Sequence, residues 1–198
     1  MSEAHEQMEH AEHVEHAAHS NRRIALLIAV LALFLSFSET LGKSAQTEAI
    51  SENVESANLW AFFQAKTVRM TLVRTAAEEM KVAAAGVSEP AAKEAMEKQI
   101  EAWQKTAARY ESEPETNEGR KELSARAKEA QEKRDLSLAK YHHYELASAA
   151  FQIGIVLASA AVITGAVALA WLSGALGVVG LGILALGLLD PHLAHHFL

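Results

Sequence analysis

The residues of this chain that are best suited to chemistry are ten histidines, which fall into two groups of five. The first group lies in an acidic N-terminal tail and consists of His5, His10, His13, His16 and His19. A glutamate stands four residues before each of the last four, a spacing that pairs side chains on a helix. Histidines three residues apart can also chelate Zn²⁺ or another divalent transition metal.

On an α-helix, each residue of a strict three-residue repeat is offset by about 60° around the helix axis from the one before it, so these histidines do not form a single binding site. Three interpretations of the tail stay open. It is a polar solvated segment, a pH sensor, or a metal-binding segment that uses His10, His13, His16 and His19.

The second group of histidines is scattered in sequence but is expected to gather at one depth in a membrane. It consists of His142, His143, His192, His195 and His196, with Glu39, Glu145 and Asp190 expected at the same level. Polar and partly aromatic side chains are favoured at the lipid headgroups, which explains such a belt without any ligand. The alternatives are a metal site or a lipid-headgroup site.

This expectation depends on three apolar runs without any Asp, Glu, Lys or Arg, at 24–38, 146–171 and 172–189. Charge-free runs near 18 residues or longer predict transmembrane helices. The chain therefore divides into a tail (1–23), a first membrane helix (24–42), a water-exposed stalk (43–145), second and third membrane helices (146–189) and a C-terminal end (190–198). We expect the second membrane helix to end near Trp171, followed by a turn at Ser173-Gly174.

The long acidic start and the missing cleavage site argue against a cleavable signal peptide. Arg22 and Arg23 directly precede the first membrane helix, and the positive-inside rule then places the tail in the cytoplasm. The opposing evidence is on the other side of the membrane, where four basic residues precede the second membrane helix: Lys128, Lys133, Arg134 and Lys140.

The stalk is predicted to be helical, with helices near 44–85, 89–111 and 116–145. Apolar residues alternate at spacings of four and three, which marks a coiled-coil seam: Leu59, Phe63, Lys66, Met70, Val73, Ala77 and Met80, then Met96, Ile100, Trp103, Ala107 and Tyr110. Gly86 with Pro90 predicts one break, and Ser112 with Glu115, at capping-box spacing, predicts another. Because the stalk must return to the membrane, we expect one outgoing arm and one returning arm that bends near Pro114.

Either the apolar seams of the two arms pack against each other within one chain, or the arms of several subunits pack together in a bundle. Trp60, Phe62 and Phe63 point in different directions around the helix, so one face is not expected to bury all three. Exposed apolar patches mark interfaces, and we therefore predict a homo-oligomer.

Small residues form stripes in the membrane helices, as in Ala25, Ala29, Ala32 and Ser36, in Gly154, Ala158, Ala161, Gly165 and Ala168, and in Gly177, Gly180 and Gly187. Such stripes allow close helix packing in lipid. Packing of the three helices within one chain explains them, and subunit contact or a pore lining are the alternatives. Few polar residues lie deep in these helices, so an ion channel is only a third candidate function.

Composition excludes several classes of function. The chain has no Cys, which removes disulfides and thiolate chemistry, and its net charge of −7 offers no basic footprint for nucleic acid. It has no phosphate-binding loop and no nucleophile elbow. We expect no enzyme activity and identify no small-molecule substrate.

Three segments together resemble an uncharacterised bacterial family of small membrane proteins, domain of unknown function 4337: the His/Glu tail, residues 58–66 (NLWAFFQAK) and residues 151–159 (FQIGIVLAS). The resemblance implies a bacterial inner-membrane setting and supplies no catalytic residues. It suggests that Trp60, Gln64 and Lys66 matter for the helical arms. We expect Lys66 to pair with a carboxylate of the other arm, such as Glu101 or Glu97.

The sequence thus predicts an all-α integral membrane protein with three transmembrane helices and a long helical hairpin stalk. Its expected partners are the lipid bilayer and further copies of itself, which makes it a self-assembling structural or scaffolding protein. The alternative is a metal-responsive or transport-accessory membrane protein that uses its histidine clusters.

Overall fold

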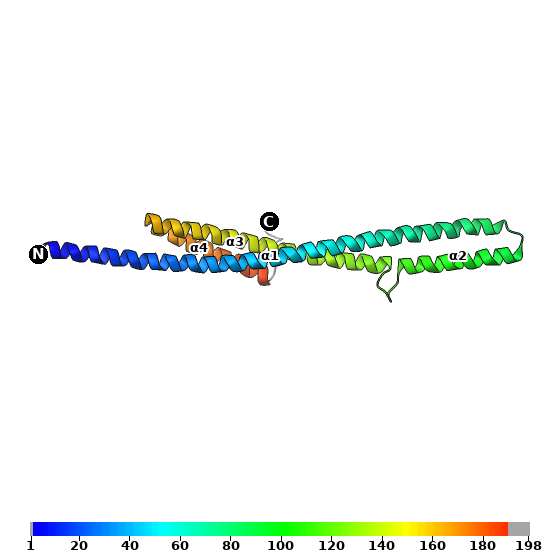
Figure 1. Ribbon diagram of the computed structural model, residues 1–198, viewed down its shortest axis with the longest axis horizontal. Coiled ribbons are helices and arrows are strands. Elements are labelled where there is room, and N and C mark those ends of the chain that lie inside the picture. The colour runs from blue at the N-terminus through cyan, green and yellow to red at the C-terminus, as the bar shows by residue number, and fades with distance from the viewer. Residues whose placement is uncertain (1, 190–198) are drawn as a thin grey trace. The chain divides into compact units, whose positions relative to one another are not determined.

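The computed structural model describes residues 2–189, with side chains from Arg22 onward. This part of the chain folds into four helices, α1 (Ser2–Ala85), α2 (Pro90–Glu111), α3 (Arg120–Thr164) and α4 (Val167–Leu189) (Figure 1). α1, α3 and α4 each contain a stretch long and apolar enough to cross a membrane. The prediction of an all-α chain with three candidate membrane-spanning helices is confirmed.

The helices form two compact units. Unit 1 contains the chain up to Glu48 and from Leu136 onward, and unit 2 contains Ala49–Asp135. α1 and α3 each contribute to both units without a break. The sequence analysis separated a membrane helix at 24–42 from a stalk helix at 44–85, but in the structure both belong to α1. Gly42 does not end the helix: it is buried, and a Cβ there would lie 3.5 Å from the Cβ of Tyr144.

In unit 1, α3 and α4 lie beside the first part of α1 (Figure 1). Leu31, Phe151 and Leu184 form the centre of the core with Ala45, Tyr144 and Ala147. The glycines of α4 allow this packing, since a Cβ at Gly180 would lie 2.7 Å from Phe151 Cε1. A side chain at Gly177 would meet Leu31 at the same distance. Small residues thus give the close helix contacts that stabilise proteins in lipid.

The turn between α3 and α4 lies at Gly165 and Ala166, so the prediction of a turn at Ser173-Gly174 is wrong. Gly165 has a φ of +70°, the left-handed conformation that commonly ends a helix, and its N–H donates to the Ala161 carbonyl at 2.9 Å. Ser173 instead lies inside α4 with no exposed surface. Its hydroxyl donates to the Gly154 carbonyl at 2.7 Å, so this polar residue links two helices.

In unit 2, the second part of α1 runs antiparallel to α2 and to the start of α3. The pairing follows from contacts at successive levels: Ser56 donates to the Ala127 carbonyl, and Arg120 donates to the Thr67 hydroxyl. Leu59 and Leu123 share a buried cluster with Ala127 and Ala130. The outgoing and returning arms are thus confirmed, and so are both predicted seams, whose members are buried or half-buried.

The returning arm bends between α2 and α3, at residues 112–119, as predicted near Pro114. The predicted capping box of Ser112 with Glu115 is wrong, because Ser112 ends α2 and its hydroxyl bonds to Glu122 of α3 instead. The carboxylate of Glu122 accepts from the Ser112 hydroxyl at 2.6 Å and from the Glu113 N–H at 3.2 Å. Gly119 makes the bend possible, since a Cβ there would collide with the Glu122 carboxylate and the Glu113 backbone.

Candidate functional site

A groove of about 500 Å³ lies between α1 and α3 in unit 1. Most of its lining residues carry a polar group, and they are Ser38, Glu39, Gly42, Lys43, Gln46, Tyr141, Tyr144, Glu145, Ser148, Ala149 and Gln152. Helical spacing explains the gathering, because Glu39, Lys43 and Gln46 share one side of α1. Tyr141, Glu145 and Ser148 share one side of α3 in the same way.

The groove is held in shape by buried hydrogen bonds. The Ser38 hydroxyl, fully buried, donates to the Tyr144 carbonyl at 2.8 Å. The Tyr144 hydroxyl donates in turn to the Gly187 carbonyl at 3.3 Å, so α4 fixes the ring that forms the back of the groove. These bonds tie all three helices of unit 1 together at this level.

The charged side chains of the groove, in contrast, are exposed and weakly engaged. Glu39 accepts a long hydrogen bond of 3.4 Å from the Gln152 amide. Glu145 lies 3.8 Å from His142 Nδ1. Among the residues with described side chains, Lys43 has no carboxylate within ion-pair distance. The groove therefore presents one cation and two carboxylates to an outside group.

His142 and His143 border this region but differ in their surroundings. The side chain of His142 is 66% exposed beside Glu145. His143 is buried, with its Nδ1 2.7 Å from the Ala139 carbonyl and its Cβ packed against Gly187. The two neighbours thus point into different environments, and one of them is held by the backbone of its own helix.

The remaining histidines named as metal ligands cannot be placed around them. The side chains of His10, His13, His16 and His19 lie outside the described residues, as do His192, His195 and His196. Within the described part of the chain, no three His, Asp or Glu side chains gather in a way that could hold a metal ion. Metal binding by either histidine group stays a prediction.

Lys66 is the most buried cation with a described side chain and lies in unit 2. Its side chain is 8% exposed, and its Nζ lies 3.9 Å from Glu113 Oε2 and 3.7 Å from Glu118 Oε2. The same Nζ stands over the rings of Phe62 and Tyr110, at 5.4 and 5.3 Å from their centres. The expected pairing with Glu101 or Glu97 is wrong, because the bend at residues 112–119 brings other carboxylates to this level.

Arg120 joins the same bend to α1. It donates to the Thr67 hydroxyl at 2.8 Å and to Glu111 at 2.9 Å, and it stacks over Phe63 with 4.9 Å to the ring centre. Arg109 binds the Glu113 carboxylate, which lowers the pKa of Glu113 and raises that of Arg109. These contacts fix the returning arm against α1.

The aromatic residues of α1 do not support the argument for an oligomer that they suggested. Trp60, Phe62 and Phe63 are all half-buried against the cluster around Leu123 within one chain. Trp60 and Phe63 meet edge to face, 5.4 Å between ring centres. The helical arms of a single copy therefore accommodate all three rings.

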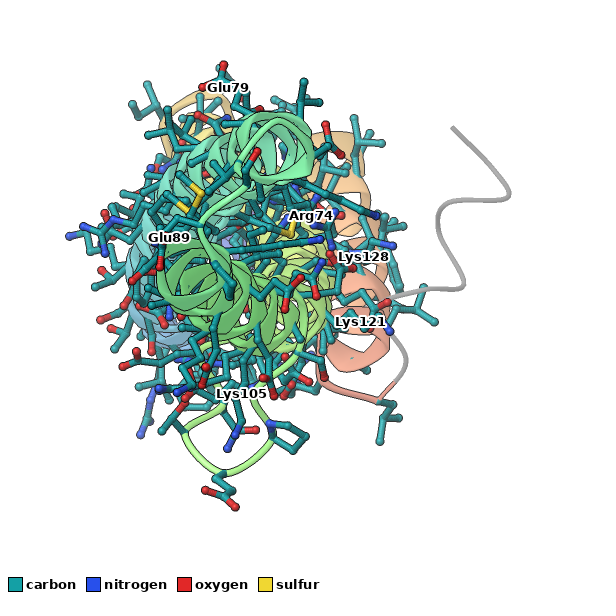
Figure 2. All side chains as sticks on the ribbon, turned by 90° about the vertical axis from the view of Figure 1, so that its right-hand side faces the viewer. Arg74, Glu79, Glu89, Lys105, Lys121 and Lys128 are labelled. Carbon is teal, nitrogen blue, oxygen red and sulfur yellow. The ribbon has the colours of Figure 1, made fainter. Side chains whose placement is uncertain are left out.

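A different face of α1 in unit 2 has no partner in the described part of the chain. It consists of large exposed aliphatic residues with alanines between them, at spacings of three and four: Ile50, Val54, Ala57, Ala61, Ala65, Val68 and Leu72, then Val82. We call these residues the outer face of α1. Glu79, which also lies on this side, projects away from α2 (Figure 2).

The small-residue stripes of unit 1 also include both buried and exposed residues. Gly154, Ala158 and Ala161 of α3 are buried, as are Gly177, Gly180 and Gly187 of α4, so packing within one chain explains them. Gly165 and Ala168 are exposed at the turn. The stripe of α1, Ala25, Ala29, Ala32 and Ser36, is exposed throughout and does not face α3 or α4.

Comparison with protein families gives one match over most of the chain. The model of a family described as Domain of unknown function (DUF4337) matches residues 20–190. No match was found among curated proteins or among solved structures.

Proposed function

The chain belongs to the DUF4337 family, and from that starting point we propose that it is a self-assembling, non-enzymatic scaffold of the bacterial inner membrane. The observation that carries the proposal is the outer face of α1. In water, an aliphatic stripe of this length is covered in most proteins. The occupant we propose is the same face of a second copy.

A second copy fits this face for two reasons. Two copies inserted in one bilayer have the same orientation, so their α1 helices run parallel and present equal residues to each other at equal depth. The face is also free of charge from Ile50 to Leu72, and among its close neighbours Ser51, Asn58, Gln64, Arg69 and Thr71 only Arg69 is charged. Parallel self-pairing of this part therefore brings no like charges together within the face, whereas Glu79 beyond it would face Glu79 of the second copy.

The size of the face predicts a moderate affinity. Its five large side chains, Ile50, Val54, Val68, Leu72 and Val82, are between 53% and 77% exposed. Each copy would remove roughly three whole aliphatic side chains from water, which is worth roughly 5–9 kcal/mol. Association from solution costs about 4–15 kcal/mol, and insertion in one bilayer reduces this cost because the helices are already aligned. Assembly is therefore expected in membranes and weaker in dilute detergent.

The lack of Cys in the chain allows a direct test. Leu72→Cys and, separately, Val54→Cys should form disulfide-linked dimers when membranes are oxidised, because a disulfide needs Cα atoms within about 7 Å. Ala102→Cys, at an exposed position of α2, is the matched control and should stay monomeric. Equal cross-linking at Ala102 and Leu72, or none at Leu72 and Val54, would contradict the pairing.

A second variant tests whether the face drives assembly. Val68→Lys combined with Leu72→Lys should reduce the mass of the particle in lipid nanodiscs, since lysines at the pairing seam repel. Ala102→Lys should leave the mass unchanged. Retained helix content by circular dichroism separates lost assembly from lost folding.

The orientation belongs to the same proposal. Arg22 and Arg23 support a cytoplasmic tail and place the groove of unit 1 on the opposite side of the membrane. A membrane-impermeant maleimide should fail to label Ser2→Cys in intact cells and should label Ala102→Cys. Labelling of Ser2→Cys and not of Ala102→Cys would show the opposite orientation, with the tail outside the cytoplasm.

A further inference from the structure

The groove of unit 1 lies where the lipid headgroups must be. Glu39 is the first charged residue after the charge-free run 24–38, and Glu145 is the last one before the run that begins at residue 146. Tyr141 and Tyr144, residues typical of the membrane–water interface, stand beside them. The groove therefore opens at the level where phosphate and amine groups of lipids are concentrated.

The polar groups of the groove match both charges of such a lipid. Lys43 provides a cation for a phosphate. Ser148 is 8% exposed, and its hydroxyl makes no hydrogen bond to any other residue in the described part of the chain, so it can donate to the same phosphate. Glu145 provides an acceptor for an ammonium group, since its exposed carboxylate is not held by a short ion pair.

The balance of charge selects among headgroups. With two carboxylates and one lysine, the groove carries one net negative charge, which disfavours a purely anionic lipid. A primary ammonium donates up to three hydrogen bonds to a carboxylate, whereas a quaternary ammonium donates none. The volume of about 500 Å³ lies within the usual range for small-ligand sites.

We propose that this groove binds the phosphoethanolamine group of a membrane phospholipid, with Lys43 and Ser148 at the phosphate and with Glu145 at the ammonium, which lies farther from the hydrocarbon core than the phosphate. The proposal does not depend on self-assembly, because none of these residues belongs to the outer face of α1 in unit 2. It also gives a role to the exposed charges that the histidine belt leaves unexplained.

Native mass spectrometry of the full-length protein in detergent can test the proposal. The protein is titrated with equal amounts of phosphatidylethanolamine, phosphatidylcholine and phosphatidylglycerol, and the retained lipids are counted. Phosphatidylethanolamine should be retained preferentially. Lys43→Gln and Glu145→Gln should each weaken this retention about tenfold, the effect of losing one charge-assisted hydrogen bond.

The controls are Lys128→Gln and Glu79→Gln, which remove equal charges from exposed positions of unit 2 and should leave retention unchanged. Equal retention of all three lipids, preference for phosphatidylglycerol, or an equal loss in the control variants would overturn the proposal. In a competition experiment, free phosphoethanolamine is added to the lipid-bound protein. Displacement of the lipid at equimolar free compound would overturn the assignment to a lipid and would assign the groove to a soluble ligand.

Discussion

Replacement of Lys66 by methionine should leave unit 2 as stable as before or about 1 kcal/mol more stable, because a buried ion pair is often neutral or unfavourable relative to an apolar side chain of similar volume. Lys66 is nearly fully buried, yet its Nζ stands 3.7 and 3.9 Å from its carboxylates, too far for short hydrogen bonds. The gain from these pairs must offset the loss of water around the ammonium.

The partners of Lys66 would not be stranded by this change. Glu113 keeps its bond to Arg109, and the side chain of Glu118 is 50% exposed and reaches water. The lost cation–π contacts with Phe62 and Tyr110 are worth about 0.5–1 kcal/mol each. A methionine sulfur near the same rings returns about 0.3–1.5 kcal/mol per contact. The lost cation–π energy and the gained sulfur–ring energy nearly cancel. The remaining effect is that the variant no longer removes a charged ammonium group from water.

Lys66→Ala provides the contrast, because it also removes the aliphatic stem that packs beneath the charge. We expect a loss of about 2–3 kcal/mol, typical of a large-to-small substitution in a core. Backbone hydrogen exchange of residues 59–70 in nanodiscs measures the free energy of local opening. The alanine variant should exchange about 30- to 140-fold faster and the methionine variant no faster than wild type. Equal acceleration in both variants would refute the reasoning and show that the charge itself stabilises the arm.

Two further predictions address packing and pH. Gly180→Ala should destabilise unit 1 by about 1–3 kcal/mol, because its Cβ would press on the buried ring of Phe151, whereas a Cβ at Gly182 meets nothing within 4 Å and Gly182→Ala should be neutral in denaturant titrations. The hydrogen bond from Ser112 lowers the pKa of Glu122 below its ordinary 4.5, so its contribution is present above that pH and is lost as the pH falls through the folded-state pKa. Hydrogen exchange at residues 112–119 should therefore differ between wild type and Glu122→Gln at pH 6 and converge as the pH falls below the folded-state pKa of Glu122.

The sequence predicted those parts of the fold that depend on periodicity. The seam from Leu59 to Met80 is buried where apolar residues recur at spacings of three and four, and charge-free runs mark all three candidate membrane spans. Periodicity is a local property of one helix, so it can be recognised in the sequence without knowing which helix packs against it.

The errors concern residues whose role depends on a second helix. Ser173-Gly174 looks like a turn, but Ser173 bonds across to Gly154, while the real turn at Gly165 lies inside a run of small residues that hides it. The partner of Lys66 was misplaced because the length of the bend at residues 112–119 sets the register of the returning arm. The groove was partly predictable, since Glu39 and Glu145 were expected at one depth, but Lys43 and Ser148 emerge only from the packing of α1 on α3.

The two faces of α1 in unit 2 differ in whether the fold of one copy buries them. The inner face, with Leu59, Lys66 and Met70, is satisfied by α2 and α3, so folding of one copy does not require the outer face to be apolar. Exposed aliphatic residues at Val68 and Leu72 therefore contribute nothing to the fold of a single copy, and in water they favour association. A face that was only a solvated surface would tolerate Val68→Glu and Leu72→Glu with no change in any property of the protein. Loss of assembly with unchanged helix content in that double variant is expected if the face exists to meet another copy.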